Sequence, residues 1–429
     1  MIETSVLPCG IRLVTETMAD VRSVAVAYWV GTGSRDEPGE LAGASHFLEH
    51  LLFKGTERRS AAAIAEELDE VGGDCNAFTT KEYTTFYVRL LSEHLSLGLD
   101  ILSDIMWAPA LRADDVEAER TVILDEILMH ADEPAELAGE RWQAALFPDH
   151  PLGTDTLGTA STVQRISRDD IRAFFDLHYR PSNMVVSVAG DCTHDAAAAE
   201  LQQRFAGSWG AEAAATAAAN PAMNRTAPGP DTLALDVVRR STEQAHLVYG
   251  MRSVSRFDER RWALSVLNHV LGGGLSSRLF QKVREQRGLA YSVWSERAAY
   301  QDSGSLAVVV GTATEHVDEV LQIVDNEFEL LAADGVTDRE LAVAKGNLRA
   351  EMLLSNEDSG ARMSRLGASM LLHGEVLTVD EVLARIDGIG KADVLAVAAE
   401  LAQAPRSLTA VGPFDEHNFE SHRPALAAR

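Results

Sequence analysis

The sequence predicts two similarly folded α+β domains, each a mostly antiparallel β-sheet with helices packed on one face. A chain of 429 residues is too long for a single hydrophobic core and suggests two domains of about 200 residues. A weakly patterned run rich in Ala, Pro and Gly lies near its middle and indicates an exposed linker. We therefore expect domains at residues 1–208 and 231–429, joined by a linker at residues 209–230.

Short segments of the first half recur in the second half at an offset of about 222 residues. Ala245–Gly250 resembles Val24–Trp29, and Glu315–His316 before a long helical pattern resembles Glu93–His94. Such an internal repeat implies two copies of one fold. In each copy the sheet and the helices must bury their apolar sides against each other, which gives the predicted layers.

The helical segment His46–His50, with the sequence HFLEH, brings two imidazoles and a carboxylate onto one helix face. At about 100° per residue, His50 lies about 40° round the helix from His46, and Glu49 lies about 60° the other way. Two imidazoles can hold a zinc ion at about 2.1 Å, and Glu49 can act as base and then as acid towards the water that zinc activates. The order H-x-x-E-H is the inverzincin signature. The pattern predicts metal-assisted hydrolysis.

This motif is not a complete site by itself. A five-residue pattern with three fixed positions also arises by chance in roughly a few per cent of chains of this length, and an exposed His pair on a helix is commonly just solvated. A catalytic zinc needs three protein ligands and one open position, so a third ligand is required elsewhere.

The acidic segment Asp114–Ile127 offers candidates for that ligand. Its acidic first turn and its apolar stripe predict a helix. Glu119 and Glu126 are seven residues apart, so they share a face about 10.5 Å apart along the axis. A solvated acidic stripe is the ordinary alternative for such glutamates.

Two strands are expected between the HFLEH helix and the acidic helix. Gly72 and Gly73 end a helix, Cys75–Thr79 predicts a short strand, and Tyr83–Val88 predicts a second one. A strand beside a metal could pair its main chain with an extended peptide, a mode of binding that depends little on the peptide sequence. An ordinary hairpin in the core is the alternative.

The first half resembles the N-terminal domain of the M16 metallopeptidases, the family of insulin-degrading enzyme, pitrilysin and mitochondrial processing peptidase. The resemblance runs from Val24 to Glu126 and includes HFLEHLLFKGT and the stretch Gly72–Thr84. In that family the Glu that completes the zinc site follows the motif after about 75 residues. In this chain 75 residues, numbers 51 to 125, separate His50 from Glu126.

The resemblance assigns roles to named residues. It implies that His46, His50 and Glu126 are the zinc ligands, that Glu49 is the catalytic base, and that Glu119 supports the zinc shell. It also casts Asn76, Ala77 and Phe78 as backbone contacts on an edge strand that pairs with the substrate.

The second half lacks the metal motif. At the matching place, Asn268–Gly272 has no carboxylate and no second His at the right spacing, and a run of three glycines follows that either approaches a ligand closely or ends a helix. By resemblance, Arg284 and Tyr291 form an R-x6-Y pair that binds substrate and completes the active site; both side chains can donate to a carbonyl or an oxyanion. Alternatively, Arg284 pairs with Glu285 or Glu259, and Tyr291 lies in the core.

Composition excludes several other functions. The net charge of −27 argues against nucleic-acid binding, which needs a basic patch. If acidic groups line a closed chamber they favour basic peptides, whereas an acidic surface that only keeps the chain soluble is the alternative.

Cys9, Cys75 and Cys192 are far apart and suggest neither a disulfide framework nor a cysteine zinc site. Because no signal-like segment or apolar run of about 18 residues is present, we expect a cytoplasmic protein without membrane contact.

The sequence therefore predicts a zinc endopeptidase of the M16 type that binds one Zn²⁺ per chain and hydrolyses unfolded peptides in an enclosed chamber. The resemblance spans both halves, and the chain length matches the branch whose two-domain subunits pair. We expect a homodimer, or a heterodimer with another M16-like chain. The alternative is a noncatalytic or partner-dependent subunit of a heterodimeric peptidase. Noncatalytic subunits typically lose the zinc motif, which this chain keeps.

Overall fold

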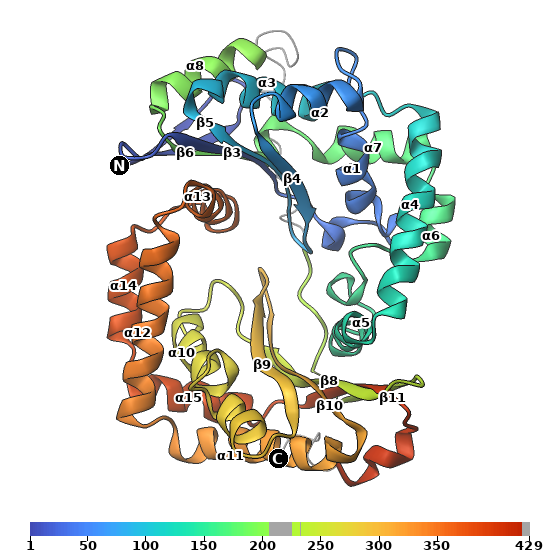
Figure 1. Ribbon diagram of the computed structural model, residues 1–429, viewed down its shortest axis with the longest axis vertical. Helices are drawn as coiled ribbons and strands as arrows, with labels where there is room; N and C mark the ends of the chain where they lie inside the picture. The colour runs from blue at the N-terminus through green and yellow to red at the C-terminus, as the bar shows by residue number, and fades with distance from the viewer. Residues whose placement is uncertain (206–224, 232, 423–429) are drawn as a thin grey trace. The chain divides into compact units, whose positions relative to one another are not determined.

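The computed structural model describes residues 1–205, 225–231 and 233–422, and these form two compact units (Figure 1). Most of the linker expected at residues 209–230 lies outside the described residues. The first unit contains Met1–Ile127, Thr154–Arg225 and Leu353–Leu377, and the second contains Leu128–Gly153, Thr226–Met352 and Thr378–Arg429. The sequence suggested two contiguous domains, whereas each unit here includes one segment from the other half of the chain.

The first unit is built on a six-stranded mixed sheet with the order β1-β2-β6-β3-β5-β4. Only β2 and β6 are parallel, so the sheet is mostly antiparallel as predicted. The edge strand β4 pairs with β5 alone. The strands are β1 (Ile2–Val6), β2 (Arg12–Thr17), β3 (Ser23–Val30), β4 (Asp74–Thr79), β5 (Thr84–Leu91) and β6 (Met184–Gly190).

Helices cover both faces of this sheet, whereas the sequence predicted one covered face. A large core joins one face to α1, α3 and α7, and includes Phe47, Leu102 and Phe174. The opposite face packs against α13, where Trp29 and Leu366 are buried together. The helices of the unit are α1 (Ala44–Leu52), α2 (Ala61–Asp69), α3 (Leu95–Trp107), α4 (Ala113–Asp132, which continues into the second unit), α6 (Ala160–Arg165), α7 (Arg168–His178), α8 (His194–Phe205) and α13 (Ser359–His373).

The second unit contains a five-stranded sheet with the order β7-β11-β8-β10-β9. This order repeats β2-β6-β3-β5-β4 of the first sheet, again with one parallel pair, β7 with β11. β3 and β8, which contain the segments matched by the offset, occupy the same place in the two sheets. The internal repeat predicted from the sequence is thus a repeat of topology. The strands are β7 (Ala234–Arg239), β8 (Gln244–Ser253), β9 (Ala290–Ala299), β10 (Gly304–Ala313) and β11 (Arg406–Gly412).

The helices of the second unit are also divided between two faces. α5, from the first half of the chain, buries Trp142 against Val248 and Val411 on one face, while α10, α11 and α15 form the main core on the other. The helices are α5 (Pro134–Leu146), α10 (Arg261–Gly272), α11 (Val317–Asp334), α12 (Asp338–Ser355), α14 (Val379–Gly388) and α15 (Lys391–Leu401). Short helices are η1 (Ser34–Asp36), η2 (Gly39–Leu41), η3 (Ser92–His94), η4 (Pro151–Gly153), η5 (Pro181–Asn183), η7 (Phe280–Glu285), η8 (Thr314–His316) and η9 (Glu416–His422).

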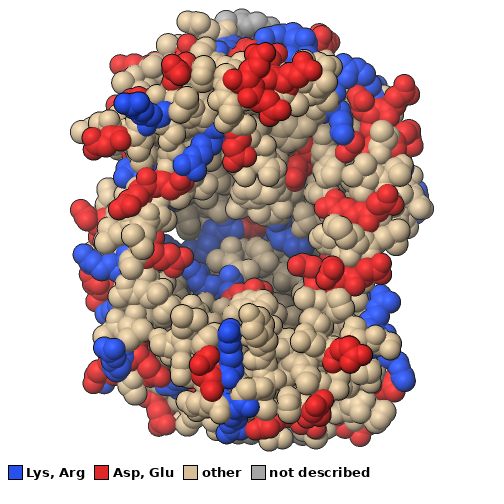
Figure 2. Space-filling view, in the orientation of Figure 1, with Lys and Arg blue, Asp and Glu red and all other residues tan. Residues whose placement is uncertain are grey.

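Charged side chains are spread over the visible face of the molecule. Figure 2 shows Asp and Glu side chains dispersed over the visible face and interspersed with Lys and Arg. The cysteines Cys9, Cys75 and Cys192 are all free. Among the described residues, none of the helices is both long and apolar enough to span a membrane.

Candidate metal centre

The helix α1 carries the HFLEH motif, and its first turn is held by a carboxylate from outside the helix. The N-cap residue is Gly43, which adopts φ +98 and has no side chain with which to cap. Glu37 accepts hydrogen bonds from the backbone N–H groups of Gly43 and Ser45, both at 2.7 Å. Burial raises the pKa of Glu37 to about 8, while the two N–H donors oppose that shift. Glu37 therefore takes the place of the missing N-cap side chain.

Three side chains converge, two from α1 and one from α4. Nε2 of His46 and Nε2 of His50 each lie 3.7 Å from Oε2 of Glu126. One candidate ligand atom from each residue lies within 4.8 Å of the others. Three donors placed tetrahedrally about 2.1 Å from a zinc ion would be about 3.4 Å apart. The two imidazole-to-carboxylate distances of 3.7 Å are close to this value, and the set of two imidazoles and one carboxylate suits zinc.

Glu119, one of the two glutamates singled out from the acidic helix, supports His50. Its Oε2 accepts a hydrogen bond from Nδ1 of His50 at 3.0 Å, and its Oε1 lies 2.5 Å from Nζ of Lys54. Because an ionised carboxylate only accepts, Nδ1 carries the proton and Nε2 keeps a lone pair for a metal. The Glu119 side chain is 6% exposed, so its charge is compensated mainly by these two groups.

Glu49 is part of α1, and its side chain reaches the end of β4. Its Oε2 accepts a hydrogen bond of 2.6 Å from the hydroxyl of Thr79. Burial raises the pKa of Glu49, and the hydrogen bonds from Thr79 oppose that rise. A carboxyl group with a raised pKa is suited to take up a proton and then donate it near neutral pH.

The strand β4 presents the residues that resemblance assigned to substrate contact. Ala77 is buried against the core, Asn76 is exposed, and Phe78 is 39% exposed. The ring of Phe78 packs edge-on against Trp29, 6.4 Å between centroids, on the sheet face that α13 covers. β4 lies at the sheet edge, so one side of its backbone has no strand neighbour among the described residues. An extended peptide could pair there.

The turn after β4 is fixed to the segment that precedes α1. Ser34 N–H donates to the Thr80 carbonyl at 3.1 Å, and Arg35 N–H donates to the Lys81 carbonyl at 2.8 Å. Arg35 also forms a buried ion pair of 2.6 Å with Glu82. Gly33 makes this approach possible, because a Cβ there would lie 2.2 Å from the Thr80 carbonyl oxygen.

Sequence reasoning missed Glu37, Lys54, Thr79 and this turn contact. The only signal for Glu37 was negative: the helix α1 begins at a glycine and has no Ser, Thr, Asp or Asn at its N-cap position, so its N–H groups needed a partner from elsewhere.

Arg284 and Tyr291 lie together in the second unit. The guanidinium carbon of Arg284 is 4.7 Å from the ring centroid of Tyr291 and 4.8 Å from that of Phe280, within the range of cation–π contact. Tyr291 is 79% exposed, so it is not a core residue. Of the two alternative partners of Arg284, Glu285 lies at 3.8 Å, whereas Glu259 pairs with Arg385 and Arg261.

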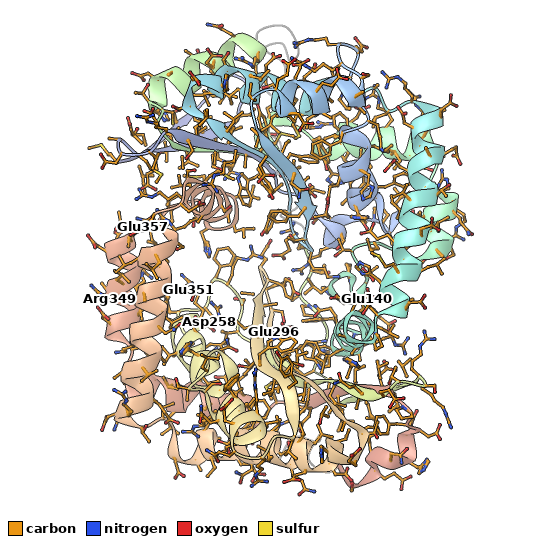
Figure 3. The ribbon with its side chains drawn as sticks, in the orientation of Figure 1. Glu140, Asp258, Glu296, Arg349, Glu351 and Glu357 are labelled. Atoms are coloured by element: carbon orange, nitrogen blue, oxygen red, sulfur yellow. The ribbon has the colours of Figure 1, made fainter. Side chains whose placement is uncertain are left out.

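Arg284 lies on the short helix η7, and Tyr291 lies on the edge strand β9. Arg284 belongs to η7, a π-helical turn, a form that is frequent at functional sites. On the edge strand β9, Trp294 is 40% exposed and donates its indole N–H to Glu296 at 3.3 Å; Figure 3 labels Glu296 on this strand. The glycine run begins where α10 ends, and a Cβ at Gly272 would lie 2.4 Å from the Ser295 backbone nitrogen. The run therefore ends a helix and also permits close packing against β9.

Comparison with protein families gives two matches. The model described as "Insulinase (Peptidase family M16)" matches residues 12–160, and the model described as "Peptidase M16 inactive domain" matches residues 165–348. All three candidate metal ligands lie within the first match.

Relatives along almost the whole chain carry the name "uncharacterized zinc protease". One from Streptomyces coelicolor is 42% identical over 427 residues, 99% of this chain and 93% of the relative. One from Mycobacterium tuberculosis is 43% identical over 407 residues, 95% and 92% of the two chains. One from Bacillus subtilis is 37% identical over 404 residues, 94% and 96% of the two chains.

Two solved structures share the fold. A structure described as the peptidase M16 inactive domain from Pseudomonas fluorescens has a TM-score of 0.87 at 20% identity and covers 97% of this chain and 98% of its own. A protease from Helicobacter pylori has a TM-score of 0.86 at 21% identity, with 96% and 99% covered. At these identities the likeness concerns the fold.

Proposed function

The chain belongs to the M16 family of peptidases, and from this premise we propose that it is a zinc-dependent endopeptidase with Glu49 as its general base. The observation that carries the proposal is the convergence of His46 Nε2, His50 Nε2 and Glu126 Oε2 within 4.8 Å, with Glu49 on the same helix as the two imidazoles. Three ligands with one open position are the arrangement of a catalytic rather than a structural zinc site.

The reaction proposed is hydrolysis of a peptide bond. Zinc held by these three groups would supply Lewis-acid polarisation of the scissile carbonyl and would make the attacking water more acidic. Glu49 removes a proton from the water as its oxygen bonds to the carbonyl carbon. It then delivers that proton to the amide nitrogen as the C–N bond breaks, so that one water is consumed and a carboxyl and an amine are released.

The proposed substrate is an unfolded peptide bound as an extra strand on β4. Pairing along a sheet edge requires an extended backbone, which folded proteins rarely offer, and it reads main-chain groups more than side chains. Thr79, the last residue of β4, contacts Glu49, so a peptide paired along β4 would pass close to the base. Arg284 and Tyr291 are proposed to hold substrate or oxyanion oxygens, since both are donors and at least partly exposed.

The competing proposal, a noncatalytic subunit, is disfavoured by the complete set of candidate groups. A chain relieved of catalysis has no need to keep two imidazoles, a ligand carboxylate and a second carboxylate with a raised pKa in contact range.

Separating the metal ligands from the base tests the proposal. His46→Ala, His50→Ala and Glu126→Ala should each lower both bound zinc and peptide cleavage. Glu49→Gln should keep zinc and lower kcat by about 10²-fold to 10⁴-fold, the usual contribution of a general base. The readouts are zinc per chain by elemental analysis and cleavage of an unfolded peptide by mass spectrometry.

The control is Glu117→Gln, an exposed glutamate on α4 that pairs with Arg120 and should leave both readouts unchanged. Loss of zinc in Glu49→Gln, or near-normal activity in Glu126→Ala, would contradict the assignment.

A further inference from the structure

We infer that Thr79 is a positioning residue, which orients the carboxylate of Glu49 and ties it to the end of the edge strand β4. The inference rests on the proposed function and deepens it. The hydroxyl of Thr79 donates to Oε2 of Glu49 at 2.6 Å, a length typical of a hydrogen bond to a carboxylate. This hydrogen bond directly connects the helix that carries the base to the strand proposed to bind the peptide.

The hydroxyl restricts how Glu49 can present itself to water. A glutamate side chain has several rotatable bonds, and its carboxylate would otherwise sample many orientations. When the hydroxyl fixes Oε2, the other oxygen remains to take the proton. Catalysis by a base depends steeply on such alignment, because a small misplacement is costly in rate.

Thr79 is itself held rigidly. Its backbone pairs with Thr84 of β5, and the turn that follows is fixed by Ser34 and Arg35 through the two backbone hydrogen bonds to Thr80 and Lys81. The segment Ser34–Glu37 thus contacts the turn at one end and caps the α1 helix through Glu37 at the other. These polar contacts therefore set the distance between the end of β4 and the helix α1. Because Thr79 lies at the end of β4, its hydroxyl is placed where it can hold the carboxylate of Glu49.

A positioning role and a purely structural role of Thr79 predict different results. If Thr79 only stabilised the fold, its loss would lower folding stability, zinc content and peptide binding along with turnover. If it positions the base, turnover alone should fall, because the zinc ligands and the backbone of β4 are unchanged.

The test compares Thr79→Val, which removes the hydroxyl and keeps the branched shape, with Thr79→Ser, which keeps the hydroxyl. Thr121→Val on α4 makes the same chemical change at an exposed hydroxyl that does not contact the base. Each protein is assayed for kcat and KM on one unfolded peptide, for zinc per chain, and for the Kd of a fluorescent peptide to the zinc-free protein. Wild type and Glu49→Gln are measured in parallel.

We expect Thr79→Val to lower kcat by about 10-fold to 100-fold, the range for a hydrogen bond to a charged group. KM, zinc content and the zinc-free Kd should stay within about twofold of wild type. Thr79→Ser should recover most of the turnover, and Thr121→Val should match wild type.

Thr79→Val with wild-type kcat would overturn the inference while the proposed function stands. So would a Thr79→Val protein whose zinc content falls and whose peptide Kd rises in step with the loss of kcat. A wild-type protein without zinc-dependent cleavage, indistinguishable from Glu49→Gln, would instead overturn the proposed function, and the inference with it.

Discussion

Glu119 shows how one buried carboxylate can organise a metal ligand. It contacts Nδ1 of His50 and the ammonium of Lys54, so it selects the imidazole tautomer while its own charge is compensated. The geometry therefore supports the role that resemblance assigned to it, a support rather than a ligand: Glu126, and not Glu119, is the glutamate in the group that could hold a metal.

Removing Glu119 should weaken zinc binding without removing a ligand. We expect Glu119→Ala to lower zinc affinity by about 10-fold to 100-fold, the usual effect of losing such a partner, with a smaller loss for Glu119→Gln because the amide oxygen still accepts from His50. Zinc affinity is measured by competition with a chelator. Glu117→Ala, two residues away and exposed, is the control. An affinity within about threefold of wild type in Glu119→Ala would show that His50 needs no such partner.

Local and distant residues differ in how far they could be predicted. His46, Glu49 and His50 were accessible from the sequence because one helical turn fixes their mutual geometry. Glu126 was accessible only through resemblance, because no periodicity relates α1 to α4. Thr79 was visible only as part of a strand, since a hydroxyl carries no pattern that indicates which carboxylate it will meet.

At the level of elements, the least predictable feature is the exchange of α5 and α13 between the two halves of the chain. An apolar stripe shows that a helix has a buried face, but it does not say which sheet buries that face. Both sheets had therefore been expected to carry helices on one face only. The strand order was more accessible, since the repeat between β3 and β8 already implied that the two sheets would match.

The packing of α13 on the first sheet depends on a glycine. A Cβ on Gly367 would lie 1.9 Å from Nε1 of Trp29, which is 1% exposed and donates to Ser187 at 2.8 Å. Gly367→Ala should therefore destabilise the protein by about 1–3 kcal/mol, or more if the indole hydrogen bond breaks. The measurement is the urea unfolding midpoint, converted with the fitted slope.

Gly346→Ala is the matched control, because Gly346 also lies within a helix and a Cβ there meets nothing within 4 Å. That change should be neutral or stabilising by up to about 1 kcal/mol through helix propensity. Equal midpoints for Gly367→Ala and wild type would mean that α13 does not pack on Trp29 in solution.

For the whole molecule, the sequence predicted the class and the repeat of the fold. On the visible face, Asp and Glu side chains are dispersed among basic side chains. The residue pattern of one chain does not predict how chains assemble. We propose, from the two-domain length and the family, that two chains pair head to tail, so that the zinc site of one chain works with Arg284 and Tyr291 of the other.

Mixed dimers test this pairing. Homodimers of Glu49→Gln and of Arg284→Ala should both be nearly inactive, because every active site has one lesion. In a mixed dimer, one site contains both lesions and the other contains neither, as two-fold symmetry requires. Random exchange makes about half of the dimers mixed, each with one intact site of two, so activity should return to roughly a quarter of wild type.

Co-expression of the two variants with different tags, followed by purification through both tags, isolates the mixed dimers directly. Their expected activity is then about half of the wild-type rate per dimer, because one site of two is intact. If both groups acted within one chain, every site in the mixed dimer would still have one lesion and no activity would return. A doubly tagged dimer without activity would therefore rule out the shared site, while leaving the zinc chemistry of His46, Glu49, His50 and Glu126 to be judged by its own variants.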